Sequence, residues 1–323
     1  AIEITKRFPG VLANDRICLN VKPGEVLGLI GENGAGKSTL LKVLNGIYPH
    51  GSYTGTLKLG GQEIRPASPH DAMRMGIGYV PQEINVLKYC SVAENIYMSD
   101  LRLEKVKGVA GNSPFVDFRA MREATEKLLK DNHIALDSRA DVRKLSIGQQ
   151  QMLMIARALA TNPKVLILDE PTTSLSSEDV RQLFNVVRKL KEKGTSIIFV
   201  THKLAEILEL TDRVTILRDG KNISTFEHDE YDTARIIHDM IGRDLKNMYP
   251  PRNVPIGAEV LRVEHLTVAH PYIANRNLIE DVSFTVRAGE VLGMAGLVGA
   301  GRSEGKNAMA NYAVNSLQDG CYP

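Results

Sequence analysis

The sequence predicts an α/β fold built around a glycine-rich loop, and three observations support this prediction. Short apolar segments alternate with amphipathic ones from residue 1 to about residue 242, which is typical of strands alternating with helices. An apolar run at 25–30 leads directly into the glycine-rich stretch GENGAGKS at 31–38, and a helical pattern follows over 37–45. The loop recurs as GLVGAGRS at 296–303, so we expect the start of a second, related domain.

The segment from about 83 to 142 differs in pattern, and we interpret it as a helical insert between two parts of the sheet. Residues 91–98 and 118–129 have helical spacing, and Asp117 is the predicted N-cap of the second helix. The apolar face of this second helix is expected to carry Phe118, Met121, Thr125, Leu128 and Leu129.

Strand and helix patterns return after the insert. We expect a strand at 164–168, a helix at 177–191, a strand at 196–200, and a hairpin at 214–226 whose turn is Asp219-Gly220. The proline-rich stretch 248–258 has no periodicity and is interpreted as a linker. The predicted domains are therefore a complete first domain at 1–247 and the N-terminal part of a second at 259–323.

Composition and charge argue against several classes of partner and site. The 40 basic and 38 acidic residues give a net charge of +2 without a long run of one sign, which argues against a nucleic-acid partner. The three cysteines are widely spaced, so neither a disulfide framework nor a zinc site is expected, and a reducing cytosol fits. No apolar run approaches the roughly 18 residues that a membrane-spanning helix needs.

The first glycine-rich loop matches G-x-x-x-x-G-K-[ST], the Walker A pattern, between a strand and a helix. In that position, backbone N–H groups and the helix N-terminus point at phosphates. Lys37 would neutralise the β- and γ-phosphate oxygens, and Ser38 would ligate Mg²⁺. The residues expected to bind ATP here are Gly31, Asn33, Gly34, Ala35, Gly36, Lys37, Ser38 and Thr39.

An apolar strand, VLIL at 165–168, ends in two carboxylates. Asp169 at the strand tip is placed to hold Mg²⁺ or its water, and Glu170 to orient or deprotonate a water that attacks the γ-phosphate. An acidic pair at a strand end is often only a solvated turn. Its combination with the Walker A loop favours the catalytic interpretation.

The stretch LSIGQQQ at 145–151 opens a predicted helix that runs through Ala160, with Ser146 as its N-cap. A hydroxyl residue followed by glycine at a helix start can bind an anion, although the same pattern also occurs as a simple cap. Its position just before the strand that ends in Asp169 favours anion binding.

Together these motifs resemble those of ATP-binding cassette (ABC) proteins, from Ile2 to Ser303. The segments that carry the resemblance are KRFPGV, PQE, SVAENI, LSIGQQQM, LDEPTTSL, THKLAEI and RDGK. More narrowly, they resemble the tandem-cassette subunits of bacterial ribose/galactose/xylose-type sugar importers, whose second Walker A loop is altered as at Arg302 here. The resemblance implies a P-loop NTPase fold, with a mixed sheet, helices and a helical subdomain, followed by the start of a second cassette.

The resemblance also assigns roles to single positions. Phe8 occupies the position of the aromatic residue that stacks on adenine. Gln82 corresponds to the Q-loop glutamine, which contacts Mg²⁺ and the attacking water, and His202 to the switch histidine, which contacts the γ-phosphate. Ser176 stands in the D-loop where many ABC proteins have Asp. The signature residues that would bind ATP held by another cassette are Ser146, Gly148 and Gln149.

The function implied by the resemblance is ATP hydrolysis that energises import of a monosaccharide, a pentose or hexose, with ATP and Mg²⁺ as cofactors. The implied partners are an integral-membrane sugar permease, moved through the helical insert, and indirectly a periplasmic or extracellular sugar-binding protein. The chain would be peripheral at the cytoplasmic face of the bacterial cell membrane. The stretch YPHGSY at 48–53 is most similar to xylose- or galactose-type members, but no residue identifies the sugar.

The second copy of the loop is expected to be incomplete. Leu40-Leu41 of the first copy correspond to Gly305-Lys306, so the helix after the second loop loses core contacts, and Arg302 predicts poor hydrolysis. We expect a reading frame truncated or shifted soon after Ser303, so that the second cassette is missing in cis or supplied in trans. Two alternatives stay open: a nucleotide-binding fragment without coupled turnover, and a soluble, non-transport ABC ATPase.

Overall fold

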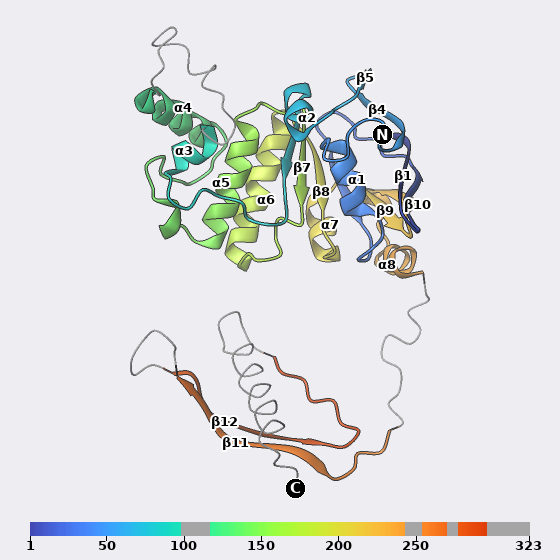
Figure 1. Cartoon of the computed structure of the whole chain (residues 1–323), viewed down its shortest axis with the longest axis vertical. Coiled ribbons are helices and arrows are strands. Elements are labelled where there is room, and N and C mark those ends of the chain that lie inside the picture. The colour runs from blue at the N-terminus through green and yellow to red at the C-terminus, as the bar shows by residue number, and fades with distance from the viewer. Residues whose placement is uncertain (98–116, 243–253, 270–276, 296–323) are drawn as a thin grey trace. The chain divides into compact units, whose positions relative to one another are not determined.

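A computed structural model of the chain describes residues 1–97, 117–242, 254–269 and 277–295. The chain divides into two compact units, Ala1–Lys246 and Asn247–Pro323, and the division lies next to the predicted linker (Figure 1). The second glycine-rich loop with Arg302, the tail that follows it, and the part of the helical insert at 98–116 lie outside the described residues.

The centre of the first unit is a six-stranded sheet with the strand order β10-β9-β3-β8-β7-β6. Five of these strands are parallel, and β10 pairs antiparallel with β9 at one edge. The carboxyl ends of parallel strands meet at one edge of a sheet, which is where an α/β fold places its site. The strands are β3 (Val26–Ile30), β6 (Ile77–Val80), β7 (Val165–Asp169), β8 (Ser196–Val200), β9 (Arg213–Arg218) and β10 (Lys221–Glu227).

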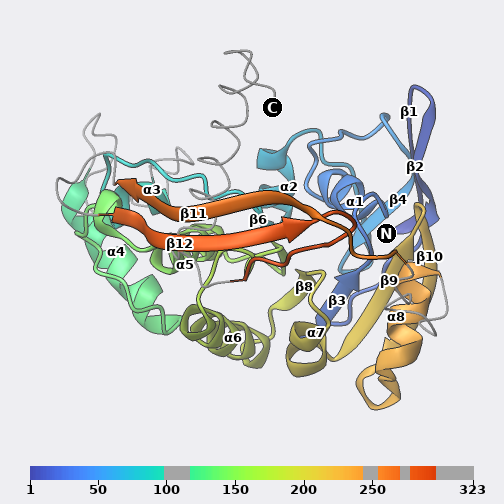
Figure 2. The same cartoon turned by 90° about the horizontal axis from the view of Figure 1, so that it is seen from below.

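Strand β3 is buried along its whole length because helices cover both faces of the sheet. Leu27 and Leu29 pack into the apolar cluster that contains α1 (Lys37–Leu44), whereas Val26 packs with α5 (Ile147–Leu159) and α6 (Ser177–Glu192). The alternation follows from the two-residue period of a strand. Figure 2 shows α1 and α6 on opposite sides of β3 and β8.

A second, antiparallel sheet with the order β2-β1-β4-β5 covers α1 from the outside. Ile4, Ile17 and Leu57 from this sheet join the same apolar cluster as Leu40 and Leu41 of α1. The antiparallel strands (blue) and the helical insert (green) lie at opposite ends of the first unit (Figure 1). The strands are β1 (Ile2–Phe8), β2 (Val11–Ile17), β4 (Thr54–Leu59) and β5 (Gln62–Ile64).

The remaining helices cover the sheet and form the insert. They are α2 (Pro69–Met75), α3 (Val92–Tyr97), α4 (Phe118–Asp131), α7 (Leu204–Leu210) and α8 (Thr233–Ile241), with short 3₁₀ turns at Val142–Lys144 and His228–Glu230. The predicted caps are confirmed, because Asp117 accepts hydrogen bonds from the first turn of α4 and Ser146 caps α5. No helix among the described residues is long and apolar enough to cross a bilayer.

The prediction for the apolar face of α4 is wrong at one residue. Met121, Thr125 and Leu129 are buried, but Phe118 is 47% exposed. A helical side chain covers the turn that precedes its own Cα, and Phe118 is the first residue of the helix, so it has no preceding turn to cover.

The predicted hairpin is confirmed as β9 and β10. Asp219 and Gly220 have φ angles of 51° and 73°, as a two-residue type I′ turn requires. The turn projects toward the glycine-rich loop, since the N–H of Gly220 donates to the carbonyl of Ala35 at 3.2 Å.

The described part of the second unit is an antiparallel pair of strands, β11 (Glu259–Ala269) and β12 (Asn277–Arg287). Apolar side chains on and after this pair, among them Val260, Leu261 and Val291, are exposed. A two-stranded sheet alone is marginally stable in water, so these side chains are available to pack against further structure.

Candidate nucleotide-binding site

The glycine-rich loop turns between β3 and α1, and its backbone conformation depends on glycine. Gly34 and Gly36 have φ angles of 86° and 97°, in the left-handed region that favours glycine. At Gly31 a Cβ atom would lie 2.2 Å from the carbonyl oxygen of Leu217, so only glycine fits beside β9. Gly36 is the N-cap of α1 and makes no side-chain cap, which leaves the first N–H groups of α1 for an anion.

Two neighbouring elements hold this loop in place. The side-chain amide of Asn14, buried on β2, donates to the carbonyl of Gly36 at 3.0 Å. The hairpin turn bridges the loop to β2, because Gly220 donates to Ala35 while its own carbonyl accepts from the N–H of Asp15 at 2.8 Å. Gly220 was predicted only as part of the hairpin turn, and neither its contacts with the loop nor the contribution of Asn14 was predicted.

Lys37 lies folded against the loop that precedes it. Its Nζ donates to the carbonyl oxygens of Gly31 at 2.7 Å and Glu32 at 3.1 Å. Burial lowers the pKa of Lys37, and the negative charges of Glu170 and Asp169 act in the opposite direction. The side chain of Lys37 is therefore fixed on the loop, and the two carboxylates at the end of β7 favour its charged form.

Asp169 is buried at the tip of β7, with 8% of the residue exposed. The hydroxyl of Tyr79, on the neighbouring strand β6, donates to Asp169 Oδ2 at 3.0 Å. Burial raises the pKa of Asp169, and the hydrogen bond from Tyr79 opposes that shift. Burial and the adjacent Asp169 charge raise the pKa of Tyr79, so the phenol keeps the proton that it donates. The contribution of Tyr79 was not predicted from the sequence.

Three side chains converge on Oε2 of Glu170, the next residue after Asp169. Gln82 Nε2 donates to it at 3.2 Å, Thr173 Oγ1 at 3.3 Å, and His202 Nδ1 lies 3.3 Å away. Gln82 follows β6 and His202 follows β8, so the parallel sheet brings together positions that are far apart in sequence. The structure places the three predicted catalytic residues, Glu170, His202 and Gln82, in one cluster.

The backbone of Glu170 is strained. Its φ angle is 45°, in a region that costs a residue with a Cβ roughly 1–2 kcal/mol, and its N–H is fixed by a hydrogen bond to the carbonyl of Val200 at 3.0 Å. Such a conformation persists where the surrounding structure determines it, and it aims the carboxylate toward Gln82 and His202.

A cavity of about 1110 Å³ opens over this cluster and the loop. Most of the predicted binding residues line it, but the buried Asp169 does not. The cavity adds Val11, Leu12, Ala13, Glu32, Thr173, Asp219, Gly220 and Met240. A second cavity of about 510 Å³, beside the antiparallel sheet, is lined mainly by aliphatic side chains and holds no such polar cluster. The predicted residues that line the first cavity are Gly31, Asn33, Gly34, Ala35, Gly36, Lys37, Ser38, Thr39, Gln82, Glu170 and His202.

Phe8 is not among the lining residues. Its ring packs edge-on against Tyr48, with centroids 5.5 Å apart, and Lys6 Nζ lies 5.2 Å from its centroid. Val11, Leu12 and Ala13, at the start of β2, line the cavity instead. The position of Phe8 in the sequence does not determine whether its ring packs against Tyr48 or lines the cavity.

The signature residues also lie away from the cavity of their own unit. Ser146 and Gln149 form a reciprocal capping box at the start of α5, and both are exposed. Gly148 is closely packed, because a Cβ atom there would lie 2.2 Å from the Asp179 carboxylate. The start of α5 is therefore exposed and does not line the cavity over the phosphate loop of the first unit, so it can contact a second molecule or domain.

The oxygen ligands at the site suit a magnesium ion. Ser38, Gln82 and Asp169 offer a hydroxyl, an amide and a carboxylate, which are hard ligands. No cluster of three or more His, Cys, Asp or Glu side chains able to hold a metal occurs in the described residues. Magnesium commonly uses one or two protein ligands together with substrate phosphates, so this sparse donor set fits it.

Comparison with known proteins connects this geometry to a family. Residues 14–173 match the model of the ABC transporter family. Over 303 residues, 93% of the chain, the sequence is 42% identical to a xylose import ATP-binding protein of Geobacillus kaustophilus and to an L-arabinose transport ATP-binding protein of Geobacillus stearothermophilus. It is 44% identical over 301 residues to a galactose/methyl galactoside import ATP-binding protein of Clostridium tetani. The chain spans 58% of the length of these relatives.

Solved structures give the same result for the fold. An ABC cassette in a dimeric, post-hydrolysis state with ADP and phosphate superimposes with a TM-score of 0.57 at 26% identity, over 70% of this chain and 97% of that one. A Clostridium perfringens cassette, part of an ABC transporter complex, gives a TM-score of 0.60 at 26% identity, over 78% and 94%. Since residues 14–173 lie in the first unit and match the model of the ABC transporter family, and since the solved cassettes share its fold, the first unit is an ATP-binding cassette of the ABC transporter family.

Proposed function

We propose that this chain binds and hydrolyses ATP and that the hydrolysis energises import of a monosaccharide through an ABC transporter. The observation that carries the proposal is the convergence of Gln82, Thr173 and His202 on Glu170, at the edge of the cavity that contains the phosphate loop. Two carboxylates, a buried lysine and a helix N-terminus at one site supply what phosphoryl transfer to water requires.

Each residue has a part in the reaction. The N–H groups of the loop and Lys37 bind the phosphates, and Lys37 balances their charge. Glu170 accepts the proton of the attacking water, oriented by Gln82, while His202 donates a hydrogen bond toward the γ-phosphate. Ser38, Gln82 and Asp169 would hold Mg²⁺, which supplies Lewis-acid stabilisation of the phosphate charge. Val11, Leu12 and Ala13 offer an apolar wall for the nucleoside, and Phe8 reaches it only if its ring leaves Tyr48.

The test for hydrolysis compares the wild-type chain with Glu170→Gln. We expect the variant to bind ATP with unchanged affinity and to turn it over at least about a hundredfold more slowly, since a general base contributes roughly 10²–10⁴. Glu178→Gln is the matched control, because Glu178 is an exposed carboxylate of the same region paired with Arg181. Equal activity of Glu170→Gln and wild type would exclude Glu170 as the base. Binding without turnover in both would establish the alternative of a nucleotide-binding fragment.

A complete site is proposed to need a second cassette, in cis or in trans, because Ser146 and Gln149 are exposed away from their own cavity. The test mixes two inactive variants, Lys37→Ala and Ser146→Arg. If the phosphate loop of one cassette works with the signature of another, the mixture regains part of the wild-type turnover. No recovery at concentrations where the wild type is active would argue against pairing in trans.

The remaining partners follow from the relatives. Relatives of 42–44% identity are named for xylose, L-arabinose and galactose, so we propose the substrate class, a pentose or hexose, and no single sugar. The proposed partners are an integral-membrane permease and, indirectly, an extracytoplasmic sugar-binding protein, with the chain peripheral on the cytoplasmic face. Uptake of labelled sugars by cells that carry wild type or Glu170→Gln tests this. Unchanged uptake of every sugar would contradict a transport role.

A further inference from the structure

Strand β6 and the segment that follows it contact both carboxylates at the end of β7. Tyr79 lies opposite Ile167 in the parallel pairing of β6 and β7, and its hydroxyl reaches Asp169 Oδ2 at 3.0 Å. Three residues further along, Gln82 donates to Glu170 Oε2 at 3.2 Å. The orientation of each carboxylate is therefore set by a side chain of the same strand and its continuation.

The hydrogen bond from Tyr79 matters because of how Asp169 is situated. Asp169 is the last residue of β7 and is buried, while the charge of Lys37 is turned toward the carbonyl oxygens of Gly31 and Glu32. A carboxylate that must serve a metal site needs a partner that fixes its rotamer, as the outer-shell partners of metal ligands do. The Tyr79 hydroxyl engages Oδ2, so this hydrogen bond restricts the orientation of the whole carboxylate, Oδ1 included.

We propose that Tyr79 is a positioning residue for the divalent cation: its hydroxyl fixes Asp169 in the rotamer that the cation, or a water bound to it, requires. This proposal rests on the proposed binding of ATP with a divalent cation. It assigns to β6 a second role beside leading into Gln82, because displacement of this strand would disturb the cation ligand and the general base together.

The test measures cation binding directly, with Mn²⁺ as the probe and paramagnetic resonance of free Mn²⁺ as the readout, in the presence of saturating ATP analogue that is not hydrolysed. Tyr79→Phe removes only the hydroxyl. We expect the Mn²⁺ dissociation constant to rise about tenfold, the usual effect of losing an outer-shell partner. Nucleotide affinity measured in excess chelator should stay at the wild-type value, because the phenol does not line the nucleotide cavity.

Tyr231→Phe is the matched control. The Tyr231 hydroxyl is also partly buried and hydrogen-bonded, to Thr211 Oγ1 at 2.7 Å, but it lies outside the nucleotide cavity. Its removal should leave Mn²⁺ binding unchanged. An equal rise in both variants would overturn the proposal, since the effect would then be general loosening of the fold.

A double-mutant cycle separates action through Asp169 from other effects. In an Asp169→Ala background, Tyr79→Phe should cause no further loss of Mn²⁺ affinity. A full additional loss there, or wild-type Mn²⁺ affinity of Tyr79→Phe alone, would overturn the proposal. A wild-type chain that binds the nucleotide analogue but no Mn²⁺ would instead contradict the proposed function, so the two failures are distinguishable.

Discussion

Glu206 accepts a hydrogen bond from Thr201 Oγ1 at 2.8 Å, and so the buried carboxylate of α7 anchors the residue immediately before His202. The other oxygen of Glu206 lies 3.2 Å from Lys203 Nζ, which also donates to the carbonyl of Thr172 at 3.2 Å. The two neighbours of His202 in the chain, Thr201 and Lys203, thus both contact the Glu206 carboxylate. Lys203 also connects this segment to Thr172, which follows Glu170.

We predict that Glu206→Ala slows ATP turnover about tenfold while ATP affinity changes less than twofold, because His202 loses its fixed position and the phosphate loop is not contacted. The variant should also lose about 2 kcal/mol of unfolding free energy, since Thr201 and Lys203 are left without their buried partner. Steady-state turnover and urea unfolding measure the two effects.

Glu209→Ala is the control for this prediction. Glu209 lies on the same helix but is exposed and paired only with Arg188 at the surface. Its loss should cost at most about 0.5 kcal/mol and leave turnover unchanged. Comparable loss of turnover in the two variants would contradict the anchoring role of Glu206.

A second prediction concerns the hairpin turn that supports the phosphate loop. Gly220 has a φ angle of 73°, and a Cβ atom there would lie 2.8 Å from the carbonyl oxygen of Ala13. We expect Gly220→Ala to push the turn away from Ala35 and to weaken ATP binding about fivefold, measured by titration of a fluorescent ATP analogue. Strain at the turn should also cost about 1–2 kcal/mol of stability.

The turn between β4 and β5 provides a matched variant, Gly61→Ala. Gly61 also has a positive φ angle, 81°, but open space surrounds the Cβ position. This variant should share the loss of stability and keep wild-type ATP affinity. Weaker ATP binding by both would mean that backbone strain alone, and not contact with the loop, explains the result.

A third prediction gives a pH dependence. Ser91 and Glu94 form a reciprocal cap at the start of α3, in which the Ser91 N–H donates to Glu94 Oε2 at 2.6 Å and Glu94 N–H donates to Ser91 Oγ at 3.3 Å. The backbone and side-chain hydrogen bonds from Ser91 lower the pKa of Glu94. A lowered folded-state pKa stabilises the protein above the unfolded-state value and ceases to do so as pH falls through the folded-state value.

Glu94→Gln should therefore be less stable than wild type by about 0.5 kcal/mol at pH 7, a small figure because the side chain is only partly buried. The difference should shrink below pH of roughly 4, where wild-type Glu94 is itself protonated. Denaturant unfolding at pH 7 and pH 3.5 measures it, with Glu123→Gln on α4 as the control. A difference that is the same at both pH values would exclude the charged cap as its source.

The sequence alone was sufficient to locate the parts of the site that consist of residues close together in the chain. The loop from Gly31 to Thr39 and the carboxylates after β7 are local patterns, and a parallel sheet brings strand ends to one edge whatever the details of packing. The confirmed hairpin turn also depends only on two adjacent residues, Asp219 and Gly220, that adopt positive φ angles.

The contributions of Tyr79, Asn14 and Glu206 could not be predicted in the same way. Each side chain forms a hydrogen bond with a residue on another element or another turn. Whether the donor and the acceptor come within reach depends on the strand register or on the helix phase. From the sequence, Tyr79 in an apolar strand would be assigned to the hydrophobic core. Only the pairing of β6 with β7 shows that its hydroxyl reaches Asp169. The exposure of Phe118 similarly depends on where its helix begins.

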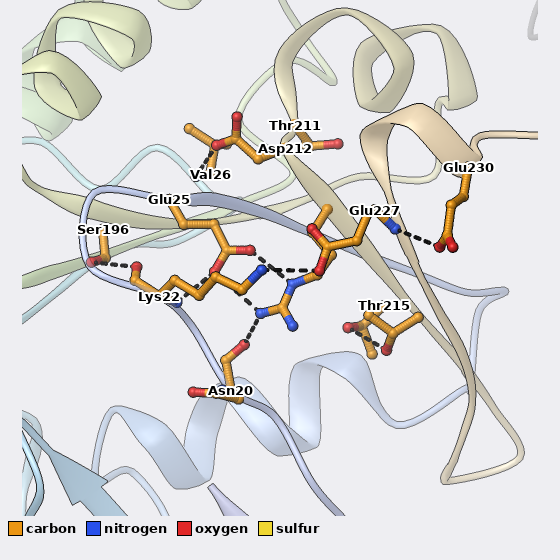
Figure 3. A network of polar contacts seen from close by, with 12 residues as sticks. Asn20, Lys22, Glu25, Val26, Ser196, Thr211, Asp212, Thr215, Glu227 and Glu230 are labelled. Carbon is orange, nitrogen blue, oxygen red and sulfur yellow. Dashed lines mark hydrogen bonds and ion pairs between the residues drawn. The ribbon is translucent and has the colours of Figure 1, made fainter.

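A fourth prediction concerns an ion pair beside the amino ends of β3 and β9, whereas the phosphate loop follows the carboxyl end of β3. Figure 3 shows Glu25 and Asn20 of this polar network. Arg213, at the start of β9, donates to Glu25 Oε1 at 2.8 Å and to Glu25 Oε2 at 3.2 Å, and the two side chains are only 12% and 5% exposed. Its guanidinium also donates to the carbonyl of Asn20 at 2.6 Å. The pair joins the loop before β3 to β9.

Breaking this pair should destabilise the fold without affecting nucleotide binding. Arg213→Ala leaves Glu25 buried without its partner, which costs about 3–5 kcal/mol, whereas Arg119→Ala removes an ion pair whose side chains are 90% and 64% exposed and should cost at most about 0.5 kcal/mol. Urea unfolding with and without ATP measures both variants, and the increment in stability that ATP provides should be the same in each. If Arg213→Ala reduced that increment, the pair would be coupled to the phosphate loop through β3, because Ile30 at the other end of that strand leads directly into Gly31.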